Sequence, residues 1–98
     1  MKPIDLRAVS AFLVVAEEQS ITRAAARMFV AQQTLSEQIR KLERALGVVL
    51  LVRTPRGVAV TEAGRELARY GAGLSTELER MVERLRMVAR EESRQSAA

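Results

Sequence analysis

Polar side chains that could read nucleic acid gather in one stretch of the chain, residues 32–44. A glutamine amide can pair with adenine N6 and N7, a glutamate can accept from cytosine N4, and serine or arginine can contact bases or phosphates. The stretch carries Gln32, Gln33, Ser36, Glu37, Arg40 and Arg44. A helix lying in the major groove of DNA would present such a set. Solvent exposure or local capping is the alternative for the two glutamines, and a solvated face is the one we favour for Arg44.

The same stretch carries an apolar stripe that predicts a helix. Leu35, Ile39, Leu42 and Leu46 follow one another at steps of four, three and four, which places them on a single helical face. Gly47 is suited to end the helix, because glycine adopts the left-handed conformation without strain. We therefore predict a helix from about residue 31 or 32 to residue 46, with its polar face outward.

Two shorter helices are predicted before it. Apolar residues at helical spacing indicate a first helix over about residues 5–18. Ser20 or Thr22 is expected to cap the second helix, and Ala24, Ala25 and Met28 are expected to face inward. The apolar turn that follows, residues 29–30, is predicted to plug the gap between the second and third helices.

The hydrophobic pattern changes after residue 47. The runs VVLLVR (48–53) and VAVT (58–61) are predicted to be short strands. The intervening TPRG has proline and glycine where a tight turn uses them. A hairpin that follows three helices would form a wing.

The segment from residue 61 to about residue 90 is predicted to be one long helix. Its apolar positions alternate in steps of four and three, the spacing of a coiled-coil seam: Leu67, Gly71, Leu74, Leu78, Met81, Leu85 and Val88. A helix about 40 Å long is too long for so small a domain to cover. We therefore expect pairing with a second copy, the alternative being a helix that lies on its own domain. Residues 91–98 are expected to be a flexible tail.

The positive charge is concentrated in the middle of the chain. The net charge is +4, and residues 20–60 carry seven basic residues against Glu37 and Glu43, a sum of +5. Residues 1–19 and 61–92 each sum to −1. A polyanion is the expected partner of such a segment, although charge alone is equally compatible with a solvated basic surface.

The composition excludes several function classes. The chain has no cysteine and no histidine, so disulfides, Cys/His zinc sites and histidine-based nucleophilic catalysis are excluded. We expect no enzymatic activity, no metal and no cofactor. The first ten residues do not form a signal peptide, and no run reaches the ~18 apolar residues of a membrane helix. A cytoplasmic, nucleoid-associated protein without a membrane partner is therefore expected.

Over about residues 4–90 the chain resembles the N-terminal DNA-binding domain of a LysR-type transcriptional regulator. The resemblance is carried by ITRAAARM, AQQTLSEQIRKLE, LGVVLLVR, RTPRG and TEAG, in this order. It implies a mainly α fold: a winged helix-turn-helix of three helices and a two-strand wing (residues 1–60), followed by a long linker helix (residues 61–90). In that family the linker helices pair in an antiparallel dimer.

The resemblance also implies which residues contact DNA. The base-reading positions fall on Gln32, Gln33, Thr34, Ser36 and Glu37, and the wing contacts fall on Arg53, Thr54 and Arg56. The family often has proline or serine at position 33 and a basic residue at position 37, so the base preference of this chain is expected to be its own.

Three further residues are candidate phosphate contacts. Arg40 lies further along the third helix. Thr22 and Arg23 open the second helix, and a helix N-terminus can receive a phosphate through its unpaired N–H groups.

The function implied is sequence-specific binding of double-stranded DNA by a homodimer on an inverted repeat. Complete family members usually continue into an effector-binding domain, so a small-molecule inducer is expected only for a full-length form that has this domain. Two alternatives remain. One is another winged-helix regulator, of the molybdate-responsive type. The other is a helical protein-interaction module that does not bind DNA.

Overall fold

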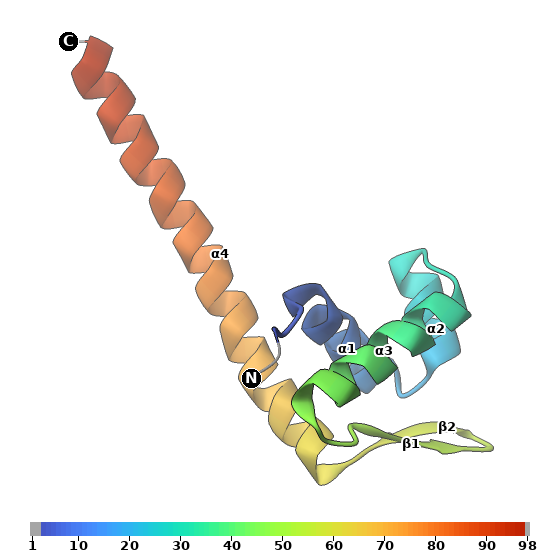
Figure 1. Cartoon of the computed structure of the whole chain (residues 1–98). Coiled ribbons are helices and arrows are strands. Elements are labelled where there is room, and N and C mark those ends of the chain that lie inside the picture. Colours follow the sequence, from blue (N-terminus) through green and yellow to red (C-terminus); the bar gives the residue numbers. More distant parts are fainter. Residues whose placement is uncertain (1–2, 98) are drawn as a thin grey trace.

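The chain folds as a small helical bundle with a hairpin and a projecting helix (Figure 1). The structure, a computed structural model, describes residues 3–97. Its elements, in chain order, are α1 (Leu6–Glu18), α2 (Ile21–Met28), α3 (Gln32–Leu46), β1 (Leu51–Thr54), β2 (Gly57–Val60) and α4 (Glu62–Ala97). The predicted fold class, a mainly α winged helix-turn-helix followed by a long helix, is confirmed.

Local side chains set the ends of the three bundle helices. Asp5 caps α1 by accepting from the N–H of Arg7 at 2.9 Å, and this hydrogen bond lowers the pKa of the Asp5 carboxyl. Of the two caps considered for α2, Ser20 is the one used, since it accepts from the N–H of Arg23. Gly47 ends α3 in the left-handed conformation, as predicted.

The hydrophobic core lies where α1, α2 and α3 meet. Its fully buried large side chains are Phe12, Val15, Leu35, Ile39 and Leu50. The stripe predicted for the third helix is therefore its buried face, and burying each such side chain contributes about 1.5–3 kcal/mol.

The predicted apolar plug between the second and third helices is wrong. Phe29 is 94% exposed and stands in the left-handed conformation at the end of α2, with φ at 58°. Ala24 and Ala25 are buried at 0% and 3% exposure. These small side chains let the helices pack closely, which leaves no space for an aromatic ring.

The hairpin is shorter than the sequence predicted. The strands are antiparallel, with Leu51 opposite Val60 and Thr54 opposite Gly57. Residues 48–50 precede β1 instead of belonging to it. Gly57, at φ 133°, brings the wing against the end of α1, where an added Cβ would lie 3.0 Å from the carbonyl oxygen of Gln19.

The last helix extends past the predicted boundary at residue 90. Residues 91–97, which we expected to form a flexible tail, continue α4, and residue 98 lies outside the described part. The segment has no proline or glycine and is rich in good helix formers. Arg94 also lies 3.8 Å from Glu91, one turn away. No helix in the described range is long and apolar enough to cross a membrane.

The predicted seam of α4 divides into two parts. Gly71 is buried against α1, where an added Cβ would lie 3.0 Å from the side chain of Leu13, and Leu67 packs partly against the core. These two positions therefore serve the chain's own domain, which was the alternative considered for the whole helix. The remaining seam residues are 39–58% exposed: Leu74, Leu78, Met81, Leu85 and Val88.

Candidate nucleic-acid interface

The outer face of α3 presents the side chains that the sequence assigned to base reading. Gln32, Gln33, Thr34 and Glu37 are exposed, and Ser36 is half-buried. Ala31 provides no side-chain cap to α3, so it offers no side-chain acceptor to the first N–H groups of the helix. Amide, hydroxyl and carboxylate groups thus occupy the first two turns of α3, where a helix entering the major groove makes its base contacts.

An ion pair crosses the next turn of α3. The guanidinium of Arg40 lies 3.6 Å from the carboxylate of Glu37, and both side chains are about half exposed. An exposed pair of this kind contributes little stability. Its effect is electrostatic, because Glu37 neutralises the arginine that would otherwise attract phosphate.

The wing reaches the same face of α3 through Arg53. Its Nη1 donates to the hydroxyl of Ser36 at 3.4 Å, a long hydrogen bond between exposed groups. Two residues predicted from separate elements are therefore neighbours in space. Donors on α3 and on the wing form one continuous surface.

Thr54 and Arg56, at the tip of the wing, have different roles. The hydroxyl of Thr54 donates to the carbonyl of Gly57 and accepts from the N–H of Arg56, so it holds the turn closed. Arg56 is exposed, and its guanidinium makes no ion pair within residues 3–97. Thr54 therefore has a structural role in the turn, whereas the charge of Arg56 is available to a ligand.

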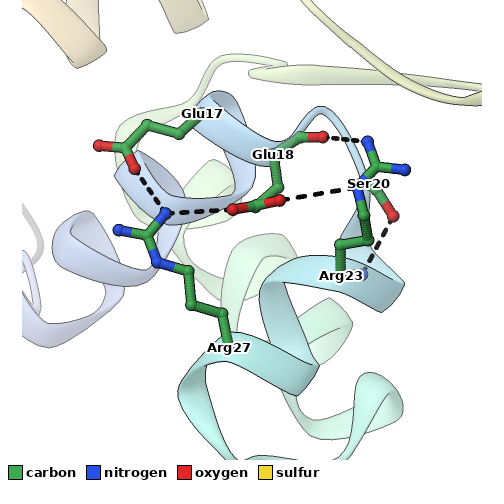
Figure 2. Close-up of polar contacts among 5 residues, drawn as sticks. All are labelled: Glu17, Glu18, Ser20, Arg23 and Arg27. Atoms are coloured by element: carbon green, nitrogen blue, oxygen red, sulfur yellow. Dashed lines mark hydrogen bonds and ion pairs between the residues drawn. The ribbon is translucent and has the colours of Figure 1, made fainter.

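The residues predicted at the start of α2 are less available than expected. Figure 2 shows the Arg23 guanidinium directed back to α1, where it donates to the carbonyl of Glu18 and lies 3.6 Å from the Glu18 carboxylate. Thr22 is exposed and leaves the cap to Ser20.

Arg27, at the other end of α2, is also paired with α1. Its guanidinium donates to the carboxylates of Glu17 at 2.6 Å and Glu18 at 3.2 Å, which raises the pKa of the Arg27 guanidinium.

Two residues with structural roles near this surface were missed by sequence reasoning. Glu43 accepts hydrogen bonds from the segment before the wing, and Thr61 caps α4 while bonding the same segment. The TEAG motif placed a threonine just before a helix, which is a usable signal for a cap. Nothing local indicated Glu43, because its partners are seven and eight residues away. No cluster of potential metal ligands occurs in the part of the chain that the structure describes.

An exposed polar helix beside a two-strand wing, both on a three-helix bundle, defines a winged helix-turn-helix protein. The family model of the bacterial regulatory helix-turn-helix proteins, lysR family, matches residues 6–65. The chain belongs to this family, as the DNA-binding domain of a regulator and not as an enzyme. This membership replaces the molybdate-responsive alternative.

Individual relatives agree with this assignment. The chain is 52% identical over 67 residues to the HTH-type transcriptional regulator PgrR of Escherichia coli, covering 68% of the chain and 22% of PgrR. It is 38% identical over 86 residues to the regulator BenM of Acinetobacter baylyi, covering 88% and 28%. The chain thus spans about a quarter of the length of these relatives.

Solved structures share the fold. The BenM DNA-binding domain in complex with catB site 1 DNA superposes with a TM-score of 0.83 at 38% identity, covering 88% of this chain and 97% of that one. The CbnR DNA-binding domain in complex with DNA gives 0.85 at 34% identity, covering 88% and 99%.

Proposed function

We propose that this chain binds double-stranded DNA with sequence specificity, with α3 in the major groove and the β1–β2 wing at the minor groove. The observation that carries the proposal is the continuous polar surface formed where Arg53 of the wing meets Ser36 of α3. Base-edge donors and acceptors lie on one part of this surface and Arg56 on another. Minor grooves attract arginine through their negative potential.

The binding unit is a homodimer formed through α4. Five apolar side chains at seam spacing, from Leu74 to Val88, are 39–58% exposed on a helix that projects beyond the bundle. A row of this kind suits a second copy of the same helix. A two-fold dimer places two recognition helices on an inverted repeat, with half-sites about one turn of DNA apart or a multiple of it.

The structures of relatives support this function by likeness. The BenM and CbnR domains are solved with DNA, and those findings concern those proteins. For the present chain, action on chromosomal DNA in the cytoplasm, in association with the nucleoid, belongs to the same proposal. A small-molecule inducer would act only on a full-length form that carries an effector domain.

Selection of bound duplexes from a random DNA pool tests the proposal. We expect an inverted repeat to be recovered. Affinity should fall steeply with salt, because each neutralised phosphate contributes a slope of about −0.9 in log K against log salt. Equal binding to selected and random duplexes would contradict sequence specificity. The absence of any bound DNA would favour the protein-interaction module instead.

A further inference from the structure

Residues 48–51, which comprise the connection from α3 and the first residue of β1, are held to α3 by hydrogen bonds to a single residue. The carboxylate of Glu43 accepts from the N–H of Leu50 at 2.8 Å and from that of Leu51 at 3.3 Å. The main-chain oxygen of Glu43 accepts from Gly47 at 2.8 Å and from Val48 at 3.2 Å. Three backbone donors of the connection, together with the N–H of Gly47 at the end of α3, therefore converge on one half-buried residue of the recognition helix.

The opposite edge of the same segment is tied to α4. The hydroxyl of Thr61 donates to the carbonyl of Val49 at 2.7 Å, and its N–H donates to the carbonyl of Leu50 at 3.0 Å. The same hydroxyl accepts from the N–H of Gly64 at 3.0 Å, so it caps the first turn of α4. Leu50 thus offers its N–H to α3 and its carbonyl to the start of α4.

Close packing at Gly64 supports this connection independently. A Cβ added there would lie 2.4 Å from the carbonyl oxygen of Leu50 and 2.6 Å from Cγ1 of Val60. The backbone of α4 therefore rests directly on the segment that Glu43 holds. Leu50 itself is 1% exposed, so this contact has little room to shift.

We propose that Glu43 and Thr61 are positioning residues that, together with the packing of Gly71 on Leu13 of α1, set the angle between α3 and α4, and so set the half-site separation that the dimer accepts. The spacing role rests on the proposed function, in which α3 reads DNA and α4 carries the partner. From Thr61 to Met81, near the middle of the exposed row, α4 runs about 30 Å. A tilt of about 7° at its base displaces that row by about 3.5 Å, close to the rise of one base pair.

The hydrogen bonds from Leu50 and Leu51 to the Glu43 carboxylate, called the tie below, are tested without DNA by amide hydrogen exchange in the free protein. Glu43→Ala should speed exchange at Leu50 and Leu51 by about tenfold, the effect of losing one ordinary hydrogen bond. Gly47 and Val48 are internal controls, because they bond the main-chain oxygen that the substitution leaves in place. Glu43→Gln keeps an accepting oxygen and should retain most of the protection. Unchanged exchange at Leu50 and Leu51 in Glu43→Ala would overturn the tie.

The spacing role is tested by affinity for inverted repeats whose half-sites are moved apart one base pair at a time. Each step shifts a half-site by about 3.4 Å and rotates it by about 34°. Glu43→Ala and Thr61→Val should flatten the native preference for one separation, while Glu43→Gln and Thr61→Ser should keep it. A sharp, native-like profile in Glu43→Ala would overturn the spacing role. If the native chain binds no DNA, both the spacing role and the proposed function are overturned. The hydrogen-exchange experiment would still test the Glu43 hydrogen bonds, because it needs no DNA.

Discussion

The guanidinium of Arg53, in the wing, donates to the hydroxyl of Ser36, in α3, at 3.4 Å. The residues are 17 positions apart in the chain and lie on different elements. Their contact makes the recognition helix and the wing one surface, so a ligand that engages one element also meets the other.

Ser36 and Arg53 should therefore be coupled in DNA binding. We expect the double substitution Ser36→Ala/Arg53→Ala to weaken binding by less than the sum of the single substitutions, with a difference of at least about 0.5 kcal/mol. Titrations of one selected duplex with the native chain, the two single variants and the double variant give the four affinities. Ser36 and Arg56, which share no contact, form the control pair and should be additive. Additivity in both pairs would show that the contact has no role in the complex.

Arg56 should contribute mainly non-specific electrostatic affinity. Replacing it by alanine should weaken binding to all duplexes similarly and reduce the salt slope by about 0.9, the effect of one lost phosphate contact. Binding isotherms at several salt concentrations measure both quantities. Arg90→Ala removes an equal charge from α4, and we expect it to leave the slope unchanged. Equal reductions of the salt slope by Arg56→Ala and Arg90→Ala would contradict a contact between the wing and a DNA phosphate.

Glu37 should lower affinity while sharpening base preference. Glu37→Gln removes a negative charge near phosphate and releases Arg40 from its 3.6 Å ion pair, so overall affinity should rise. Discrimination at one base pair should fall by about 1–3 kcal/mol, the value of a good base contact. A panel of half-site variants measures both effects. Glu66→Gln removes the same charge from an i,i+3 pair on α4. It should neither raise affinity nor lower base discrimination. An unchanged base preference in Glu37→Gln would exclude the specificity role.

The exposed row of α4 should hold the dimer together. Leu78→Glu places a charge in this row and should produce monomers at concentrations where the native chain is dimeric, because an unpaired charge is costly to bury. Sedimentation velocity measures the change. Met87→Glu is the matched control, since Met87 is similarly exposed, at 50% against 42% for Leu78, but lies on the opposite side of the helix. Dissociation by Met87→Glu alone would place the interface on the other face.

Phe29 should be dispensable for folding. A bulky residue in the left-handed conformation costs roughly 1–2 kcal/mol, whereas asparagine visits this region readily. Phe29→Asn should therefore raise the free energy of unfolding, by about 1 kcal/mol, in a denaturant titration. Ala26→Asn introduces the same residue at an exposed helical position of α2 and should lower it by several tenths of a kcal/mol. A destabilised Phe29→Asn would mean that the ring packs against the domain after all.

Local elements could be predicted because their determinants are local. The stripe of Leu35, Ile39 and Leu42 marks the buried face of α3, since helical period alone brings these residues together. Gly47 and the TPRG turn marked where the helix and the first strand end, because few residues suit those backbone conformations. The resemblance to the family rested on five short motifs in one order, ITRAAARM, AQQTLSEQIRKLE, LGVVLLVR, RTPRG and TEAG.

Contacts between elements could not be predicted in this way. The 4–3 spacing from Leu67 to Val88 is uniform, yet Leu67 and Gly71 pack on the chain's own domain while the later positions stay exposed. Spacing identifies a helical face but not the surface that covers it. The same limit explains Arg23, whose guanidinium turns to Glu18 on the preceding helix.

The sequence by itself determined the helices, the wing and the residues on the polar face of α3, because periodicity, caps and turn residues act over a few positions. Only the tertiary structure decided which of these residues meet. It joined Ser36 to Arg53, exposed Phe29, and brought Glu43 and Thr61 to opposite edges of residues 48–51. These relationships depend on the angles at which whole elements pack, and those angles come from the sum of many contacts across the core.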